Sequence, residues 1–282
     1  MLFQGGTLKS PAPLLLLLIT ISCWGAKVER VRIQSKTLGR VVAITVVLPH
    51  SYPSEIKQGT RFPVVYLLHC AGGSPGNFLK DSRLEQAVDS TSLIVVAPFD
   101  GTGLGWWIDS PNLQRSKLST FISGELKNWV DARYRTRPDR ANTGIAGHSM
   151  GGFGAFHNTI VHHEIYGAMF AAKALVDLPG HSGQYGLEGV VGTYSSNRAA
   201  YDSLDILTNA HKLARSRARI RFYSGPNDWF VHENRRLHHI LDSLSIPHDY
   251  YENSEGHYPV YPASMYRMLH YFDSTFAQTP KP

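Results

Sequence analysis

Residues 147–151 read Gly-His-Ser-Met-Gly, the G-x-S-x-G pattern of a nucleophile elbow. In such an elbow a serine lies on a tight turn between a buried strand and a helix. The glycines let the backbone bend sharply, so that the hydroxyl faces a cleft. Residues 141–146 predict the strand and residues 153–163 predict the helix. The N-terminus of that helix directs unpaired N–H groups toward developing negative charge. We therefore predict that Ser149 is a nucleophile.

A serine hydroxyl needs a neighbouring base to take its proton. The chain has fourteen histidines, and His257 has the most suitable position. It follows Gly256 on a loop between a strand predicted at 247–252 and a helix predicted at 263–276. The alternatives that we considered lie in predicted helices or inside a strand: His162, His163, His238, His239, His248 and His270. We predict His257 as the base.

The acid that orients the histidine is expected between Ser149 and His257 in the chain. Residues 219–224 alternate polar and apolar side chains, as a strand does, and run into a Gly-Pro-Asn-Asp loop that ends at Asp228. Asp228 thus follows a strand's C-terminal end, where open α/β sheets place their sites. The rival carboxylates lie in a long irregular stretch: Asp177, Asp202 and Asp205.

Acyl chemistry also needs N–H donors for the oxyanion that develops during attack. The residue after the nucleophile, Met150, is expected to supply one. The apolar run 62–69 predicts a buried parallel strand, and it ends in a Cys-Ala-Gly-Gly-Ser loop. We predict the N–H group of Ala71 as the second donor. The alternative interpretation of this loop is an ordinary glycine-rich turn.

The elements that must position these residues alternate between strands and helices. They predict an α/β fold with a mostly parallel, doubly wound sheet and helices on both faces. An N-terminal antiparallel strand pair is expected at 28–33 and 41–47, and a further buried strand at 93–97. The chain has 282 residues, of which 43% are hydrophobic and 11% aromatic. This predicts one catalytic domain at 27–282.

The first residues differ in kind from this domain. The apolar run 14–21 is too short to span a bilayer and predicts a signal peptide over 1–26, with cleavage near Gly25 or Ala26. We therefore expect an exported protein that is periplasmic, on the cell surface or secreted. Cys23 also resembles a lipoprotein processing site, which would provide a lipid anchor as the means of membrane attachment.

Five motifs together resemble one group of proteins. They are Leu-Leu-His-x-x-Gly-Gly at 67–73, Trp-Trp-Ile-Asp-Ser-Pro at 106–111, the elbow, Gly-x-x-Asp at 225–228 and Gly-His at 256–257. The chain resembles, over 28–276, the Putative esterase family of the α/β-hydrolases. That family holds S-formylglutathione hydrolases, tributyrin-type esterases, feruloyl esterases and mycolyltransferases.

The resemblance implies an α/β-hydrolase fold and a serine esterase that hydrolyses carboxylic esters through an acyl-enzyme. Ser149, Asp228 and His257 match the catalytic triad of the family. Met150 and Ala71 match its oxyanion donors.

The sequence departs from the family pattern at three places. The oxyanion strand ends His69-Cys70 where the family usually has His-Gly or Asp-Gly, and Tyr258 and Tyr261 replace the usual tryptophan after the histidine. Lys173 lies where many members have Ser-Gly. A lysine there favours an acidic or polar substrate, or else is a solvated loop charge, which is the interpretation that we prefer.

Aromatic side chains suit sugar rings or phenolic acyl groups, although core packing is an equally good explanation for each one. We predict these substrate-binding residues: His69, Cys70, Trp106, Trp107, Trp229 and Tyr258. The expected substrate is a small-molecule or glycan ester, either carbohydrate-linked or short-chain. An acyltransferase with the same triad, a non-catalytic carbohydrate-binding protein and a peptidase are the alternatives.

The sequence gives no support for other functional classes, such as metal-dependent, cofactor-dependent or nucleic-acid-binding proteins. No motif indicates a metal or a cofactor. The net charge is +6, but the four arginines within 215–221 fit a solvated face, and no nucleic-acid-binding motif is present. The two cysteines, Cys23 and Cys70, are not expected to pair. Nothing in the sequence indicates an oligomeric state.

Overall fold

A computed structural model describes residues 25–114 and 116–278. The predicted signal segment, with Cys23, lies almost wholly outside the described residues, so its export and lipidation stay predictions. The centre of the fold is one sheet of eight strands. They are β1 (Lys27–Ser35), β2 (Arg40–Leu48), β3 (Val64–Leu68), β4 (Ile94–Pro98), β5 (Thr143–His148), β6 (Ala168–Ala172), β7 (Arg219–Ser224) and β8 (Asp249–Glu252).

The strand order is β1-β2-β4-β3-β5-β6-β7-β8. The β1–β2 and β2–β4 pairs are antiparallel, and every pair from β4 to β8 is parallel. This confirms the predicted fold class, including the antiparallel strand pair at the start. The C-terminal ends of β3, β5, β6, β7 and β8 therefore lie along one edge of the sheet, and the loops beyond them can meet there.

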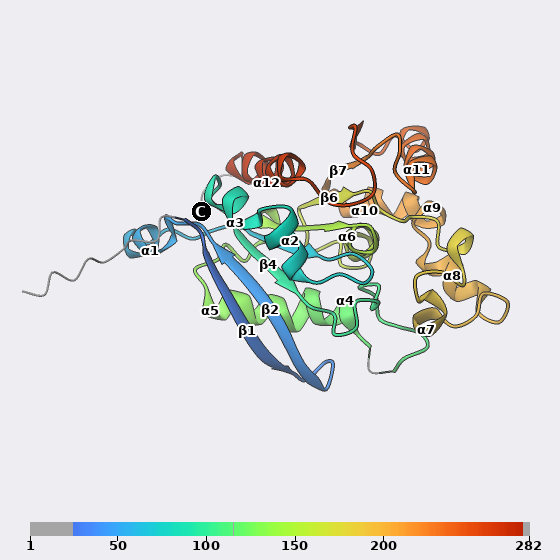
Figure 1. The fold of residues 1–282 in the computed structure, drawn as a ribbon, viewed down its shortest axis with the longest axis horizontal. Coiled ribbons are helices and arrows are strands. Elements are labelled where there is room, and N and C mark those ends of the chain that lie inside the picture. The colour runs from blue at the N-terminus through green and yellow to red at the C-terminus, as the bar shows by residue number, and fades with distance from the viewer. Residues whose placement is uncertain (1–24, 115, 279–282) are drawn as a thin grey trace, which may run out of the picture.

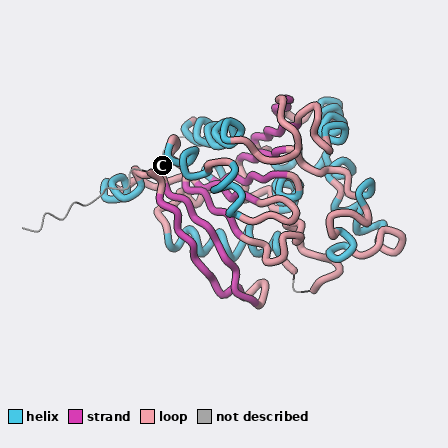
Figure 2. The backbone as a smooth tube through the Cα atoms, in the orientation of Figure 1, coloured by secondary structure: helices cyan, strands magenta, loops and turns pink. Residues whose placement is uncertain are grey.

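Helices cover both faces of the sheet (Figures 1 and 2). They are α1 (Tyr52–Glu55), α2 (Pro75–Asp81), α3 (Leu84–Asp89), α4 (Leu118–Thr120), α5 (Lys127–Arg133), α6 (Met150–Val161), α7 (Leu187–Val191), α8 (Arg198–Leu204), α9 (Ile206–Asn209), α10 (Leu213–Ser216), α11 (Val231–Ser243) and α12 (Pro262–Ala277). Shorter 3₁₀ turns are η1 (Ile56–Gln58), η3 (Arg140–Asn142), η4 (Pro179–His181) and η5 (Ala210–Lys212), and η2 (Phe121–Leu126) is a π-helical segment between α4 and α5. No helix among the described residues is both long and apolar enough to cross a membrane.

Two apolar layers hold the helices against the sheet. One joins α2, α3 and α12 to one face, and the other joins α4 to α6 and α9 to α11 to the opposite face. The central strands are apolar on both faces because both are covered, and every residue of β3 and β4 is buried. The sheet is thus a rigid support for the loops at its C-terminal edge.

Candidate active site

Ser149 lies between β5 and α6 with φ 57° and ψ −119°. This region is unfavourable for a residue with a side chain and persists only where the surroundings impose it. Two hydrogen bonds hold the backbone in this conformation. The Ser149 N–H group donates to the Ala172 carbonyl at 2.9 Å, and the Ser149 carbonyl accepts from the Phe153 N–H group at 2.9 Å. The serine is therefore held in the strained geometry of an elbow.

Only glycine fits at position 151, because the start of α6 closely approaches the end of β3 there. A Cβ atom at this position would lie 2.0 Å from the Leu68 carbonyl oxygen of β3, far inside any normal contact. Any larger residue would push the start of α6 away from the end of β3. The second glycine of the G-x-S-x-G pattern thus sets the distance between the serine and the oxyanion loop, which is residues 70–74.

The three residues predicted as a triad form one hydrogen-bonded chain. The His257 Nε2 atom lies 3.0 Å from the Ser149 Oγ atom, and His257 Nδ1 lies 2.8 Å from Asp228 Oδ2. Because a carboxylate can only accept, Nδ1 carries the proton of the neutral ring, and Nε2 is left to accept from the serine. All three residues are almost completely buried, at 4–5% relative exposure.

The acid and the histidine meet because their loops touch. Asp228 follows β7 and His257 follows β8, as predicted. A Cβ atom on Gly225 would lie 1.8 Å from the Glu255 carbonyl oxygen, so only glycine permits this contact. The Asp228 carboxylate is oriented by the Phe230 N–H group, which donates to Oδ1 at 2.8 Å and leaves Oδ2 for the histidine.

The peptide that carries the Ala71 N–H group is also fixed. Its carbonyl, that of Cys70, accepts from His69 Nδ1 at 2.9 Å and from the Gly73 N–H group at 3.0 Å. In a trans peptide the N–H bond points opposite to the carbonyl. Among residues 25–114 and 116–278, the Ala71 N–H group has no hydrogen-bond partner, and neither does that of Met150. Both groups remain free to bind an oxyanion.

His69 supports this loop from inside the protein, where it is 1% exposed. Its Nε2 atom accepts from the Asp100 N–H group at 3.3 Å, and its carbonyl accepts from Trp107 Nε1 at 3.0 Å. Burial lowers the pKa of His69, so the ring stays neutral. Both ring nitrogens already have partners within the protein, so the prediction that His69 contacts substrate is left to its carbon atoms and stays a prediction.

The aromatic residues divide into two groups. Trp106 and Trp107 are buried in the core at 1% and 0% exposure, which contradicts their predicted place in a cleft wall. Trp229 and Tyr258 are 61% and 46% exposed beside the histidine. The Trp229 ring stacks on the His257 imidazole at 4.3 Å between centroids, and Tyr258 meets it edge-on at 4.6 Å. Only this second pair has a surface that a substrate can reach.

Cys70 and Tyr258 share a small cavity of about 40 Å³ with His69, His148 and Phe78. Its walls thus include the residues directly before Ala71 and Ser149 and the residue directly after His257. Burial raises the pKa of the Cys70 thiol, so the side chain stays protonated and is a wall of the cavity, not a second nucleophile.

Lys173 lies in a different environment from the one that the sequence interpretation preferred. Its side chain is fully buried, not a solvated loop charge. The ammonium donates to Glu255 Oε2 at 3.0 Å, to the Gly256 carbonyl at 2.9 Å and to the Pro259 carbonyl at 2.9 Å. These three acceptors lie on both sides of His257. Lys173 therefore holds the loop that carries the histidine and is not available to a substrate.

His148, directly before the serine in the chain, holds the same loop through a hydrogen bond to its backbone. Burial, with the neighbouring charges of His257 and Lys173, lowers the pKa of His148 well below its usual range. Its neutral ring donates from Nε2 to the His257 carbonyl at 2.9 Å. His148, directly before the nucleophile, and Lys173, directly after β6, thus both hold the backbone of the loop that carries His257.

We expect Lys173→Met to lower kcat about 100-fold, because a displacement of about 1 Å at a reacting group has an effect of that size. The free energy of unfolding should fall by about 3 kcal/mol, since the Glu255 carboxylate, which is only 11% exposed, loses its ion-pair partner. Adding Glu255→Gln should recover stability without recovering kcat. Steady-state ester hydrolysis and thermal unfolding measure the two effects separately.

Lys127→Met is the matched control, because Lys127 also pairs with a carboxylate, that of Asp131 at 2.7 Å, and with the Pro138 carbonyl at 2.8 Å. It should leave kcat unchanged. If Lys173→Met unfolds more easily but keeps kcat within about threefold, Lys173 has a structural role alone.

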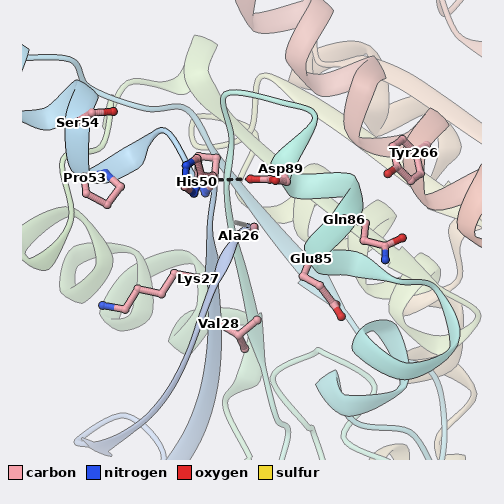
Figure 3. A pocket seen from close by; sticks show the side chains of 12 residues that line it. Ala26, Lys27, Val28, His50, Pro53, Ser54, Glu85, Gln86, Asp89 and Tyr266 are labelled. Atoms are coloured by element: carbon pink, nitrogen blue, oxygen red, sulfur yellow. Dashed lines mark hydrogen bonds between the residues drawn. The ribbon is translucent and has the colours of Figure 1, made fainter. Parts of the chain in front are cut away.

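A large open cavity of about 1080 Å³ lies elsewhere, between the start of β1, α1, α3 and α12. Figure 3 shows Glu85 and Gln86 of α3 with Tyr266 of α12 around it, and the His50 N–H group donates to the Asp89 carboxylate at 2.8 Å across one side. None of the predicted site residues lines this cavity. Its size therefore gives no reason to move the candidate site.

Comparison with known proteins points the same way as the geometry. The family described as "Putative esterase" matches residues 35–279. An esterase of Mycobacterium tuberculosis is 32% identical over 128 residues, which are 44% of this chain and only 27% of that protein's length. An S-formylglutathione hydrolase of Saccharomyces cerevisiae is 23% identical over 287 residues, covering 90% of this chain and 93% of that protein.

A solved structure of a ferulic acid esterase superposes with a TM-score of 0.75 and 23% identity. It covers 90% of this chain and 99% of its own. At this level of identity the superposition shows the shared fold alone.

Proposed function

This chain belongs to the Putative esterase family, and we propose that it is a serine hydrolase of carboxylic esters in which Ser149 forms an acyl-enzyme. The observation that carries the proposal is the chain from Ser149 Oγ through His257 to Asp228, with contacts of 3.0 and 2.8 Å. Free N–H groups at Ala71 and Met150 add the second requirement of acyl transfer. Nucleophile, base, orienting acid and oxyanion donors thus occur at one edge of the sheet.

In the proposed reaction Ser149 Oγ attacks the ester carbonyl carbon while His257 Nε2 takes the hydroxyl proton. The carbonyl oxygen becomes an oxyanion between the two N–H groups, each of which lowers the barrier by about 3 kcal/mol. Asp228 stabilises the imidazolium that forms. The C–O bond then breaks, the leaving alcohol takes the proton from His257, and water repeats the sequence to release the acid.

We propose that the acyl group is short. The cavity beside Cys70, His148 and Tyr258 has about 40 Å³, which is room for roughly three water-sized groups. A formyl or acetyl group fits this volume and a long chain does not. The tight packing of His69 and Phe78 around the cavity prevents its enlargement without movement of the core.

The alcohol side of the substrate has more room. A cavity of about 660 Å³ is lined by both apolar and polar residues, among them Leu104, Val190, Arg40 and Asn112. It borders the loop at Gly103, whose carbonyl accepts from the Gly72 N–H group of the oxyanion loop at 2.7 Å. A ring-shaped leaving group such as a sugar has room here, and exposed Trp229, which stacks on His257, offers an aromatic face beside the histidine.

A series of nitrophenyl esters from acetate to decanoate tests the proposal. We expect kcat/KM to fall at least about tenfold between the butyrate and octanoate esters, because the surplus methylenes do not fit the cavity. Intact-mass measurement after mixing should detect one acetyl group on the chain. A preference for octanoate would contradict the short-acyl proposal.

The reaction class has its own test. Absence of turnover for every ester, together with no labelling by a fluorophosphonate, would contradict hydrolysis and favour a binding protein. In the presence of a sugar acceptor, a product mixture dominated by the transferred ester would favour the acyltransferase.

A further inference from the structure

A second group of ligand-type side chains lies on α11, which Figure 1 shows at one end of the molecule. His238, His239 and Asp242 each offer one ligand atom, and these three atoms lie within 4.8 Å of one another. Residues 238 and 242 are one helical turn apart and share a face of the helix, and residue 239 lies three before Asp242. The proposed ester hydrolysis uses none of the three.

A hydrogen-bonded chain fixes the tautomer of His238. His248 Nδ1 lies 2.8 Å from the Ile246 carbonyl, which can only accept, so Nδ1 carries the proton. The Nε2 atom of a neutral His248 is then an acceptor, and it lies 2.7 Å from His238 Nδ1. His238 Nδ1 must therefore donate, which leaves the lone pair on His238 Nε2, 3.5 Å from an Asp242 carboxylate oxygen.

His248 is a rigid support for this arrangement. Its side chain is only 3% exposed, and its ring stacks on Phe222 of β7 at 5.8 Å between centroids. Metal-binding histidines characteristically donate their second ring N–H group to a fixed acceptor, which orients the ring and raises its basicity. His248 supplies such an acceptor to His238.

The electrostatics also favour a cation here. The three residues lie in the C-terminal half of α11, where the unpaired carbonyl groups give the helix a partial negative charge. The last turn contains no basic residue. Asp242 therefore adds negative charge at the unfavourable end of the helix, and a bound cation would reverse that effect.

We propose that His238, His239 and Asp242 bind a divalent transition-metal cation of the zinc class. Two imidazole nitrogens and one carboxylate oxygen suit Zn²⁺, with water completing the coordination. Mg²⁺ and Ca²⁺ prefer all-oxygen sites, so they are expected to bind far more weakly. Through the His238–His248 contact, the cation stiffens the connection between α11 and the segment that enters β8.

Calorimetric titration of the full chain with zinc chloride tests the site. We expect one Zn²⁺ per chain, and a rise in Tm of roughly 5 °C at one hundred times the Kd. Magnesium chloride at the same concentration should give no rise. His239→Ala should weaken Zn²⁺ binding at least about tenfold, because it removes a ligand without disturbing the orientation of His238.

His232→Ala is the matched control, since His232 is an exposed histidine of the same helix outside the cluster. It should keep the wild-type Kd. His248→Phe retains a ring against Phe222 but removes the acceptor, so it should weaken binding about tenfold with all three ligands intact. The proposal is overturned if wild type gives no binding heat, if His239→Ala binds as tightly as wild type, or if His257→Ala abolishes binding.

Discussion

Ser149→Ala should lower kcat for a short-chain nitrophenyl ester by about a million-fold, the loss seen when a serine hydrolase loses its nucleophile. The substitution removes the one oxygen that lies 3.0 Å from His257 Nε2. It keeps the Cβ atom, so the positive φ angle and the backbone hydrogen bonds of the elbow are unchanged. Steady-state hydrolysis, corrected for the spontaneous rate, measures the loss, and thermal unfolding should give a nearly unchanged Tm.

Ser224→Ala is the control for this prediction. Ser224 is a fully buried serine at the end of β7, on the same edge of the sheet, and its hydroxyl has no hydrogen-bond partner among the described residues. Its replacement should leave kcat within about twofold, because no reacting group loses a contact. Equal losses in the two variants would mean that the rate reflects packing at this edge and that Ser149 is not the nucleophile.

The positions of the main strands could be predicted because their patterns are local. The alternation of residues 219–224 gives β7 with the predicted bounds. The strand into the elbow is different: it was expected at 141–146 and β5 is Thr143–His148. The difference arises because the strand continues to the residue directly before the strained serine, and glycine-rich backbone gives no propensity signal for that extension.

The same limitation affects the helix after the serine. It was expected from Phe153, and α6 begins at Met150. Gly151 and Gly152 are poor helix formers, but both are needed where α6 touches neighbouring elements: a Cβ at 152 would lie 2.8 Å from Ala174. Tertiary contact thus overrides propensity at a functional position, and a single sequence does not contain that contact.

β8 begins two residues later than its sequence pattern predicts. The strand was expected from residue 247 and begins at Asp249. Pro247 has no N–H group to donate to a neighbouring strand, and the His248 ring bonds the Ile246 carbonyl. Whether a polar side chain bonds its own backbone or a neighbouring strand depends on packing that is absent from the sequence pattern.

Lys173 marks the limit of motif reasoning for the site. The elbow, acid and histidine were located by local signals, a glycine pattern and loops after strands. The acceptors of Lys173 lie more than 80 residues later in the chain, at Glu255, Gly256 and Pro259. The one available signal was the departure from the family's Ser-Gly at this position. The predicted place of Trp106 and Trp107 in a cleft wall was wrong for the same reason, because burial is a property of the assembled fold.

Asp228→Asn should lower kcat about ten-thousand-fold, through the tautomer of His257. The Phe230 N–H group donates to Oδ1 at 2.8 Å and will hold the amide oxygen of the asparagine in that place. The amide NH₂ group then faces His257 Nδ1 and donates to it. The imidazole proton must move to Nε2, which can no longer accept from Ser149. The negative charge that stabilises the imidazolium is lost as well.

Asp205→Asn separates this effect from the loss of any buried carboxylate. Asp205 was one of the three rival acids in the sequence, and it is also buried, accepting from the N–H groups of Leu178 and Thr208 at 3.0 and 2.8 Å. Its replacement should change Tm and leave kcat within about threefold, because asparagine still caps α9. If Asp228→Asn retained more than about a tenth of kcat, Asp228 would not set the tautomer of His257. The hydrogen bond at 2.8 Å would then be a structural contact only.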